Sequence, residues 1–350
     1  MTDSSHPGAP PVRGARLIVI AAAVVVVLAG LRAAQAFVVP LLMAVFLTVL
    51  CAPPLRWLRR RGLPEWLAVA LVVSAAALVV LAVAVVLGGT VQTFLAALPE
   101  YRMRLDGMVQ GALSYLEAQG IRLSAEQLAG QMNVGAVFDL AGLTAGSLVA
   151  AFSNVVLVLL LVAFFLFEVR RGPRLIRRAM GDPAADLSAL ERGAEKVQRY
   201  LVIKTILSLV NAVVVAGVCV FFGVDFAILW GLLAFLFNYV PNVGSVIAGV
   251  PPVLVALVQL GPAQAAVVAG ILLVVDVISG HIVEPKVMGD RLGLSPLVVM
   301  VSLVFWGWMW GPVGTILSVP LTSMAKIMFE QTQDLRWLAI LLGPDDPDPR

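Results

Sequence analysis

The sequence predicts an all-α, polytopic membrane protein, and three observations carry that prediction. Hydrophobic residues make up 61% of the 350 residues and charged residues only 13%, whereas soluble domains are about half apolar and a quarter charged. Several apolar runs reach about 20 residues, the length that an α-helix needs to cross a bilayer. The arginines lie beside these runs, so membrane topology explains the net charge of +3 better than a nucleic-acid partner does.

The first part of the chain is predicted to hold three spans within residues 17–89. They follow a polar, proline-rich stretch, residues 1–16, which we expect to be a disordered cytoplasmic tail. The predicted spans are 17–31, 33–50 and 66–89. Arg56 and the arginines at 59–61 place the turn between the second and third spans in the cytoplasm. Arg32, directly before Ala-Gln-Ala, favours a retained first span over a cleaved signal peptide.

The middle of the chain alternates polar and apolar stretches. Residues 90–146 mix charged side chains with Leu and Met at helical spacing, which predicts an external domain of amphipathic helices. Residues 147–168 are apolar and return as a span. Residues 169–200 are rich in Arg and Lys, which predicts a cytoplasmic helical loop.

The C-terminal half carries an internal repeat. The segment PNVGSVIAGVP at residues 241–251 is followed by a similar segment, PVGTILSVP, at residues 312–320. Gly223, Phe235 and Gly244 match Gly293, Phe305 and Gly314 at a constant offset of 70 residues. Interrupted apolar segments in corresponding positions of two repeats point to a transporter's substrate site. We therefore predict repeat units at 201–262 and 263–328, followed by a cytoplasmic tail at 329–350.

The two segments that carry the repeated break are too long for one ordinary crossing. As continuous helices, residues 226–260 and 296–328 would measure about 52 Å and about 50 Å. Each segment either crosses once, which gives eight crossings in all, or folds back as a re-entrant hairpin. Hairpins place Lys286 and Arg291 inside, as the positive-inside rule prefers. The favoured architecture has about six full transmembrane helices and two broken re-entrant hairpins in an inverted repeat.

The breaks supply the predicted substrate path. The first break offers two amides, a phenol and a hydroxyl beside uncapped half-helix ends, which suit a polar solute or a cation. The alternative is that these groups only cap the hairpin tip. The second break is aromatic and predicts either a gate or an interfacial belt. The predicted path residues are Asn238, Tyr239, Pro241, Asn242, Gly244, Ser245, Trp306, Trp308, Gly311, Pro312 and Gly314.

Ionisable residues within apolar stretches are candidates for ion coupling. Asp276 lies in an otherwise apolar helix, where a carboxylate is costly, and Glu284 follows two turns later. The alternative for both is an ion pair or an interfacial position. Lys204 and Asn211 are weaker candidates on the preceding span. A further set of residues is predicted to have a structural role, as prolines and a glycine that interrupt helices or as charged residues of the loop: Pro251, Pro285, Lys286, Asp290, Arg291, Gly293, Pro296 and Pro320.

The sequence contains none of the enzyme motifs HExxH, P-loop or GxSxG. Gly244-Ser245 with His281 lacks the setting of an intramembrane serine protease. Two histidines and two isolated cysteines predict neither a metal site nor a disulfide. We therefore expect no enzyme activity and no cofactor.

Three long blocks resemble the autoinducer-2 exporter family, also called the PerM family. They are LLAFLFNYVPNVGSVIAGVPP at 232–252, EPKVMGDRLGLSP at 284–296 and FWGWMWGPVGTILSVPLT at 305–322. The resemblance implies a bacterial inner-membrane transporter that exports the furanone signal autoinducer-2 and assembles as a homo-oligomer, with pentamers described. Some members are described as sodium(lithium)/proton antiporters. Asp290 and His281 stand where members of the family often vary.

The combined prediction is export of a small polar solute across the bilayer, with both termini in the cytoplasm. Sodium(lithium)/proton antiport through Asp276 or Glu284 is the alternative. A membrane scaffold that does not transport and works through residues 90–146 is a third possibility.

Overall fold

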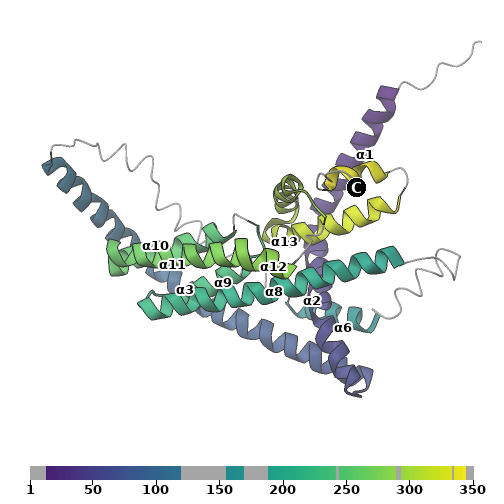
Figure 1. Cartoon of the computed structure of the whole chain (residues 1–350), viewed down its shortest axis with the longest axis horizontal. Coiled ribbons are helices and arrows are strands. Elements are labelled where there is room, and N and C mark those ends of the chain that lie inside the picture. Colours follow the sequence, from purple (N-terminus) through teal and green to yellow (C-terminus); the bar gives the residue numbers. More distant parts are fainter. Residues whose placement is uncertain are drawn as a thin grey trace, which may run out of the picture.

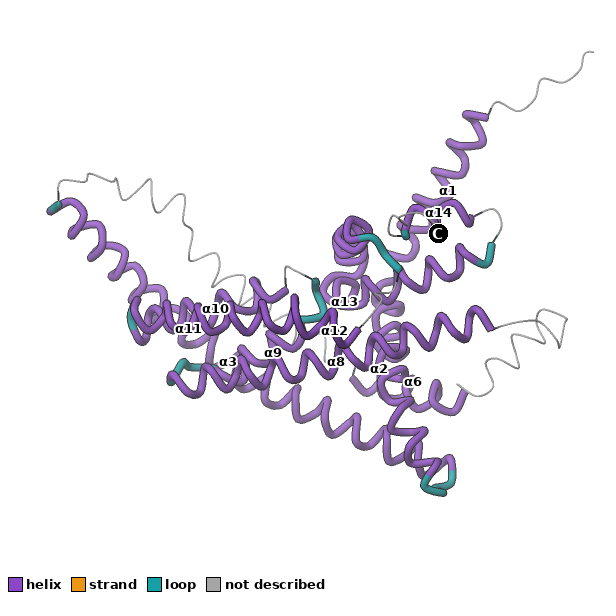
Figure 2. Tube along the Cα trace, viewed as in Figure 1, coloured by secondary structure: helices purple, strands orange, loops and turns teal. Residues whose placement is uncertain are grey.

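In the computed structural model, the described residues are 13–119, 155–168, 188–241, 244–288, 293–332 and 335–343. These residues form helices joined by short turns, with no strand among them (Figures 1 and 2). The helices are α1 (Arg13–Ala33), α2 (Gln35–Arg60), α3 (Glu65–Ala118), α6 (Val155–Glu168), α8 (Ser188–Phe222), α9 (Ala227–Phe237), α10 (Gly244–Leu260), α11 (Pro262–Val277), a π-helix (Ile278–Val283), α12 (Glu284–Met288), α13 (Pro296–Glu330) and α14 (Arg336–Leu342).

Five of the described helical segments are long and apolar enough to cross a membrane. They are Gln35–Arg60, Glu65–Tyr115, Glu191–Phe222, Pro262–Val287 and Pro296–Glu330. Large apolar side chains face outward along them; Phe221, for example, is 84% exposed. Such a surface is stable in hydrocarbon, where each helix satisfies its own backbone hydrogen bonds. The prediction of an all-α polytopic membrane protein is confirmed.

Helices α2, α3 and α6 pack together in the N-terminal half. Their shared core contains Ala44, Val69 and Val162, each at most 2% exposed. The turn between α2 and α3 carries arginine contacts: the Arg61 guanidinium lies 4.7 Å from the Trp57 ring, and Arg59 pairs with Glu65 at 3.6 Å. These contacts hold the turn at the end of two apolar helices.

Helix α3 is one uninterrupted helix of 54 residues, about 81 Å long at 1.5 Å per residue. It continues past residue 89, where the sequence analysis places the start of an external domain, and reaches the far end of the molecule in Figure 1. Residues 120–146 of that predicted domain lie outside the described residues. Helix α8 likewise crosses the predicted boundary at residue 200, from the basic stretch into the apolar span.

The extension of α3 is joined to the turn between α8 and α9. Tyr101 Oη donates to Asp225 Oδ2 at 2.6 Å, and Gln259 Nε2, at the end of α10, donates to the same oxygen. The backbone N–H of Asp225 donates to Gln259 Oε1 at 3.0 Å. Three segments far apart in the sequence therefore meet at one carboxylate.

Tyr101→Phe should lower the stability of the purified protein by about 1.5–3 kcal/mol, the cost of a hydrogen bond to a charged group. Tyr101 is 6% exposed, so water cannot readily replace the lost donor. The matched control is Tyr115→Phe in the same helix, where the ring is 68% exposed. Thermal unfolding in detergent measures both, and equal melting temperatures would show that the Tyr101 contact contributes nothing.

The segment 226–260 folds back on itself as the pair α9 and α10. At the base of this pair, Asp225 bonds to Gln259 as described above. Along its length, Trp230 and Leu233 of α9 share a core with Val255 and Ala256 of α10. At 11 residues, α9 spans only about 16 Å, too little to cross a hydrocarbon core of about 30 Å.

Helix α13 also folds back, at non-helical dihedral angles in Trp310 and Gly311. Lys326 Nζ donates to the Gly293 carbonyl at 2.5 Å. These residues are 33 positions apart and would lie about 50 Å apart along a straight helix. The fold-back of both segments favours the hairpin alternative over two single crossings; their depth in a bilayer stays a prediction.

The sequence repeat is also a repeat of backbone contacts. A Cβ added to Gly244 would overlap the carbonyl oxygen of Phe237, and one added to Gly314 would overlap that of Trp306. The nearest side-chain atoms are the Cβ atoms of Val240 and Trp310, each at 3.2 Å and related by the same offset of 70. Each hairpin therefore closes by direct contact of a glycine with the preceding half-helix.

Candidate functional site

A buried polar seam runs between α8 and the first break. It consists of Lys204, Thr205, Ser208 and Asn211 on α8, Asn238 and Tyr239 at the break, and Glu284 on α12. Lys204, Ser208 and Asn211 are spaced i, i+4 and i+7, so they lie on one face of the helix. Their exposed fractions are 2%, 0% and 8%. Polar groups buried in a membrane helix are costly and mark functional positions.

The first break is tied to this helix by two side-chain hydrogen bonds. Asn238 Nδ2 donates to Ser208 Oγ at 2.8 Å, and the Tyr239 and Thr205 hydroxyl oxygens lie 2.6 Å apart. Tyr239 is 4% exposed. Its ring packs edge-on against Phe46 of α2, with centroids 5.9 Å apart. The phenol predicted to meet solute is therefore held inside the protein.

The remaining residues of the first break shape its turn. Gly244 is buried against Phe237, while Pro241 and Ser245 are half-buried. Asn242 lies outside the described residues. The structure thus brings Asn238 and Tyr239 to α8 and leaves the predicted role of Asn242 as a prediction.

Lys204 and Glu284 form an ion pair that joins the two repeat units. Lys204 Nζ lies 2.7 Å from Glu284 Oε2, and the side chains are 2% and 25% exposed. Glu284 directly follows the π-helix, which replaces the α-helical ladder between α11 and α12. Short π-helical segments occur frequently at functional sites. Here it sits between Asp276 and Glu284.

Asp276 lies apart from the seam. Its side chain is half-buried, and no hydrogen bond or ion pair of its carboxylate is found among the described residues. Its backbone carbonyl accepts from Ser279 Oγ at 3.3 Å. Of the two predicted ion-coupling residues, therefore, only Glu284 belongs to the polar seam.

Aromatic side chains pack across the second break, within α13. Trp306 Nε1 donates to Thr322 Oγ1 at 2.9 Å across the fold-back, and the Trp306 and Trp310 rings stack with centroids 4.9 Å apart. Gly311 adopts φ 62° at the bend, a value that favours glycine. Pro312 follows it and is exposed.

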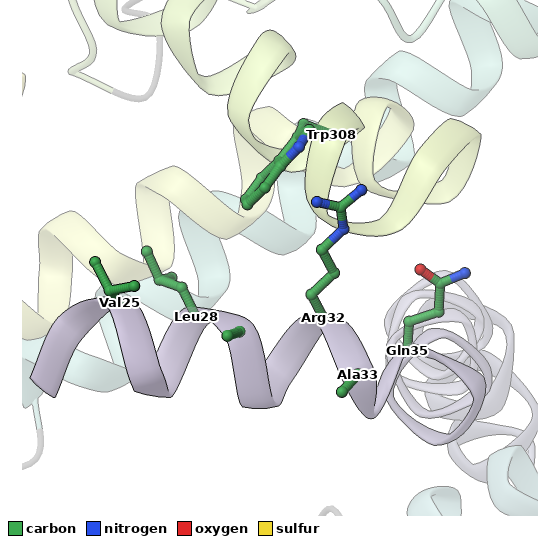
Figure 3. Close-up of a pocket in the computed structure, with 7 residues that line it drawn as sticks. Val25, Leu28, Arg32, Ala33, Gln35 and Trp308 are labelled. Carbon is green, nitrogen blue, oxygen red and sulfur yellow. The ribbon is translucent and has the colours of Figure 1, made fainter. Parts of the chain in front are cut away.

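Trp308 faces a groove of about 530 Å³ beside α1 (Figure 3). Arg32 points toward Trp308 in this view, and its guanidinium carbon lies 4.2 Å from the ring centroid. Val25 and Leu28 form the apolar wall. A cation over an indole face is attracted by the ring's quadrupole, so this contact connects α1 to the second break.

The structural set of residues occupies turns and helix interiors. Ser295 Oγ accepts from the Val298 N–H at 3.2 Å and caps α13, with Pro296 at its first turn. Gly293 has φ 66° and accepts from Lys326. The others are distributed as follows: Pro251 and Pro320 are buried inside α10 and α13, Pro285 is half-buried, Lys286 is exposed, and Asp290 and Arg291 lie outside the described residues.

Sequence reasoning missed Thr205, Ser208 and the Asp225 cluster. The spacing of Lys204, Ser208 and Asn211 in an apolar run was a signal that could have revealed the seam, because it places all three on one helical face. Asp225 lies in a short turn, where a carboxylate is ordinary and gives no such signal. Among the described residues, no three His, Cys, Asp or Glu side chains gather to hold a metal ion.

The fold and the seam define a polytopic α-helical membrane protein with two fold-back segments and a buried polar interior. The profile of the AI-2E family of transporters matches residues 18–334. The chain therefore belongs to the AI-2E transporter family, as the sequence resemblance implied.

Relatives match along nearly the whole chain. The putative transport protein YhhT of Escherichia coli K12 is 38% identical over 341 residues, which is 97% of this chain and 98% of that protein. The AI-2 transport protein TqsA of Escherichia coli K12 is 36% identical over 330 residues, 94% of this chain and 96% of TqsA. A putative transport protein of Haemophilus influenzae is 34% identical, with 92% and 94% covered.

Proposed function

We propose that this protein exports a small polar solute, similar to autoinducer-2, along the polar seam between α8 and the first break. The seam carries the proposal, because it gathers buried hydrogen-bonding groups at the tip of a broken hairpin. Discontinuous helices near the middle of the membrane are where transporters bind their substrates. The name of the relative TqsA supports autoinducer-2 as the first solute to test.

The proposed mechanism assigns the two repeat units to one moving body and the N-terminal helices to a support. The Lys204–Glu284 pair lies between α8 and α12, so it can hold the two units in register. The N-terminal helices contact the repeat units through three pairs of residues. Phe46 packs on Tyr239, Arg32 lies over Trp308, and Tyr101 donates to Asp225. Movement would have to break or slide these three contacts.

Uptake of labelled autoinducer-2 into inverted vesicles tests the proposal, with and without sodium and proton gradients. Export from cells corresponds to uptake by inverted vesicles, so we expect uptake above that of vesicles lacking the protein. A strict requirement for sodium, or sodium movement without solute, would support antiport instead. Vesicles with no flux of any kind would support the scaffold.

The same proposal places the protein in the bacterial inner membrane with both termini in the cytoplasm and both hairpins re-entrant. A membrane-impermeant thiol reagent applied to intact cells should label Gln264→Cys but not Lys286→Cys. Both native side chains are exposed, whereas Cys51 and Cys219 are buried, so background labelling should be low. Labelling of Lys286→Cys from outside, with Gln264→Cys protected until the membrane is permeabilised, would reverse the proposed topology.

A further inference from the structure

Asn211 carries an uncompensated polar atom inside the seam. The residue is 8% exposed, and its Oδ1 is fully buried. This oxygen accepts no hydrogen bond from any described group. Buried amides in folded proteins nearly always have a partner, so an exception calls for an explanation such as a bound molecule.

Ser208, one turn before Asn211, has a hydroxyl hydrogen without an acceptor. Its Oγ accepts from Asn238 Nδ2, but it donates to no described group. Other hydroxyls in the protein donate to a carbonyl of the preceding turn, as Thr205 of α8 does to Leu201 at 2.7 Å and Ser302 of α13 does to Val299 at 2.8 Å. The seam therefore holds one unused donor and one unused acceptor on the same helical face.

We propose that Ser208 and Asn211 bind a hydroxyl group of the transported solute, an inference that rests on the proposed function. A hydroxyl both donates and accepts, so it can accept from Ser208 Oγ–H and donate to Asn211 Oδ1. Residues three apart on a helix have Cβ atoms about 5–6 Å apart. One oxygen at about 2.8 Å from each polar atom fits that separation.

The chemistry of the seam favours a neutral hydroxylated solute over a metal cation. Lys204 lies on the same face one turn away, and its ammonium is paired with the Glu284 carboxylate at 2.7 Å, so this ion pair supplies no net negative charge. A cation would meet only the neutral oxygens of Ser208 and Asn211 at this position, whereas a hydroxyl group can use both the donor and the acceptor. The Asn238–Ser208 bond lies at the C-terminal end of α9, beside the first break.

The test uses the full-length protein in two separate assays. In detergent, the melting temperature is measured with and without autoinducer-2, a hydroxylated furanone, and with a furanone of the same ring that lacks hydroxyl groups. In proteoliposomes, uptake of the labelled forms of both is measured. The variants are Asn211→Leu, which keeps the side-chain size, and Ser208→Ala. Ser302→Ala removes a hydroxyl that is already bonded within its own helix and serves as the matched control.

We expect autoinducer-2 to stabilise the wild-type protein and the Ser302→Ala control more than the hydroxyl-free furanone does. Asn211→Leu and Ser208→Ala should abolish that difference and weaken binding of autoinducer-2 about ten-fold, as the loss of one hydrogen bond predicts. Without ligand, Asn211→Leu should melt at or above the wild-type temperature, because it removes an unpaired buried amide.

Three results would overturn the inference. In the first, autoinducer-2 fails to stabilise the wild type more than the hydroxyl-free furanone does; in the second, Asn211→Leu binds and transports autoinducer-2 normally. The second result would make the amide an unpaired structural group. Stabilisation by sodium chloride that is lost in Asn211→Leu would also overturn it, in favour of a cation site. Failure of the proposed function looks different: Asn211-dependent binding would persist while the wild type shows no uptake.

Discussion

Glu284→Ala is expected to destabilise the protein by about 3–5 kcal/mol, the usual cost of removing one partner from a buried ion pair. The reason is the burial of Lys204, which is 2% exposed and lies 2.7 Å from the Glu284 carboxylate. Without that carboxylate, the ammonium keeps its desolvation cost and loses its Coulombic partner. The melting temperature of the purified protein should fall accordingly.

The matched control for this variant is Lys286→Ala, which alters an exposed charged residue two positions away. Surface substitutions of this kind usually change stability by less than about 0.5 kcal/mol. The double variant Lys204→Met with Glu284→Leu should recover most of the lost stability, because an apolar pair of similar volume often replaces a buried ion pair without cost. Equal melting temperatures for Glu284→Ala and Lys286→Ala would contradict this account of the pair.

The double variant also separates stability from transport. If the pair holds α8 and α12 in register during movement, the recovered protein should still carry solute poorly. Normal uptake by the stable double variant would mean that the ion pair serves folding alone.

The repeat and its two bends could be predicted from the sequence, because glycine and proline at matching positions indicate where a helix is interrupted. Gly244 and Gly314 stand at the same offset in the sequence, and each touches the carbonyl of the preceding half-helix. The cost of polar residues in apolar helices likewise identified Glu284 and Lys204 as candidates. Such signals depend on each residue and its near neighbours.

The pairings within the seam could not be predicted, because they depend on how helices pack. Asn238 and Ser208 are 30 residues apart, and Lys204 and Glu284 are 80 apart. A single sequence shows that each group needs a partner but does not show which groups meet. The length of α3 was missed for a related reason: the charged residues after position 89 change its surroundings without ending the helix.

The substitutions Gly244→Ala and Gly314→Ala are expected to lower stability by about 3 kcal/mol each, the upper end of overpacking costs. A methyl group at either position overlaps a backbone carbonyl oxygen, Phe237 in one hairpin and Trp306 in the other. A side chain could rotate away, but a carbonyl can move only if the two half-helices separate. We therefore expect each change to open the bend that closes its hairpin.

The control is Gly249→Ala in α10, five residues after Gly244, where an added Cβ meets nothing within 4 Å. It should leave stability unchanged or raise it by up to about 1 kcal/mol, because alanine is the better helix former. Thermal unfolding and solute uptake are measured on all three variants. If opening either bend disrupts the path, uptake should fall in both hairpin variants and persist in the control. Wild-type melting and uptake in Gly244→Ala would show that the close glycine contact is not required, and the solute path would then have to be sought near Asp276.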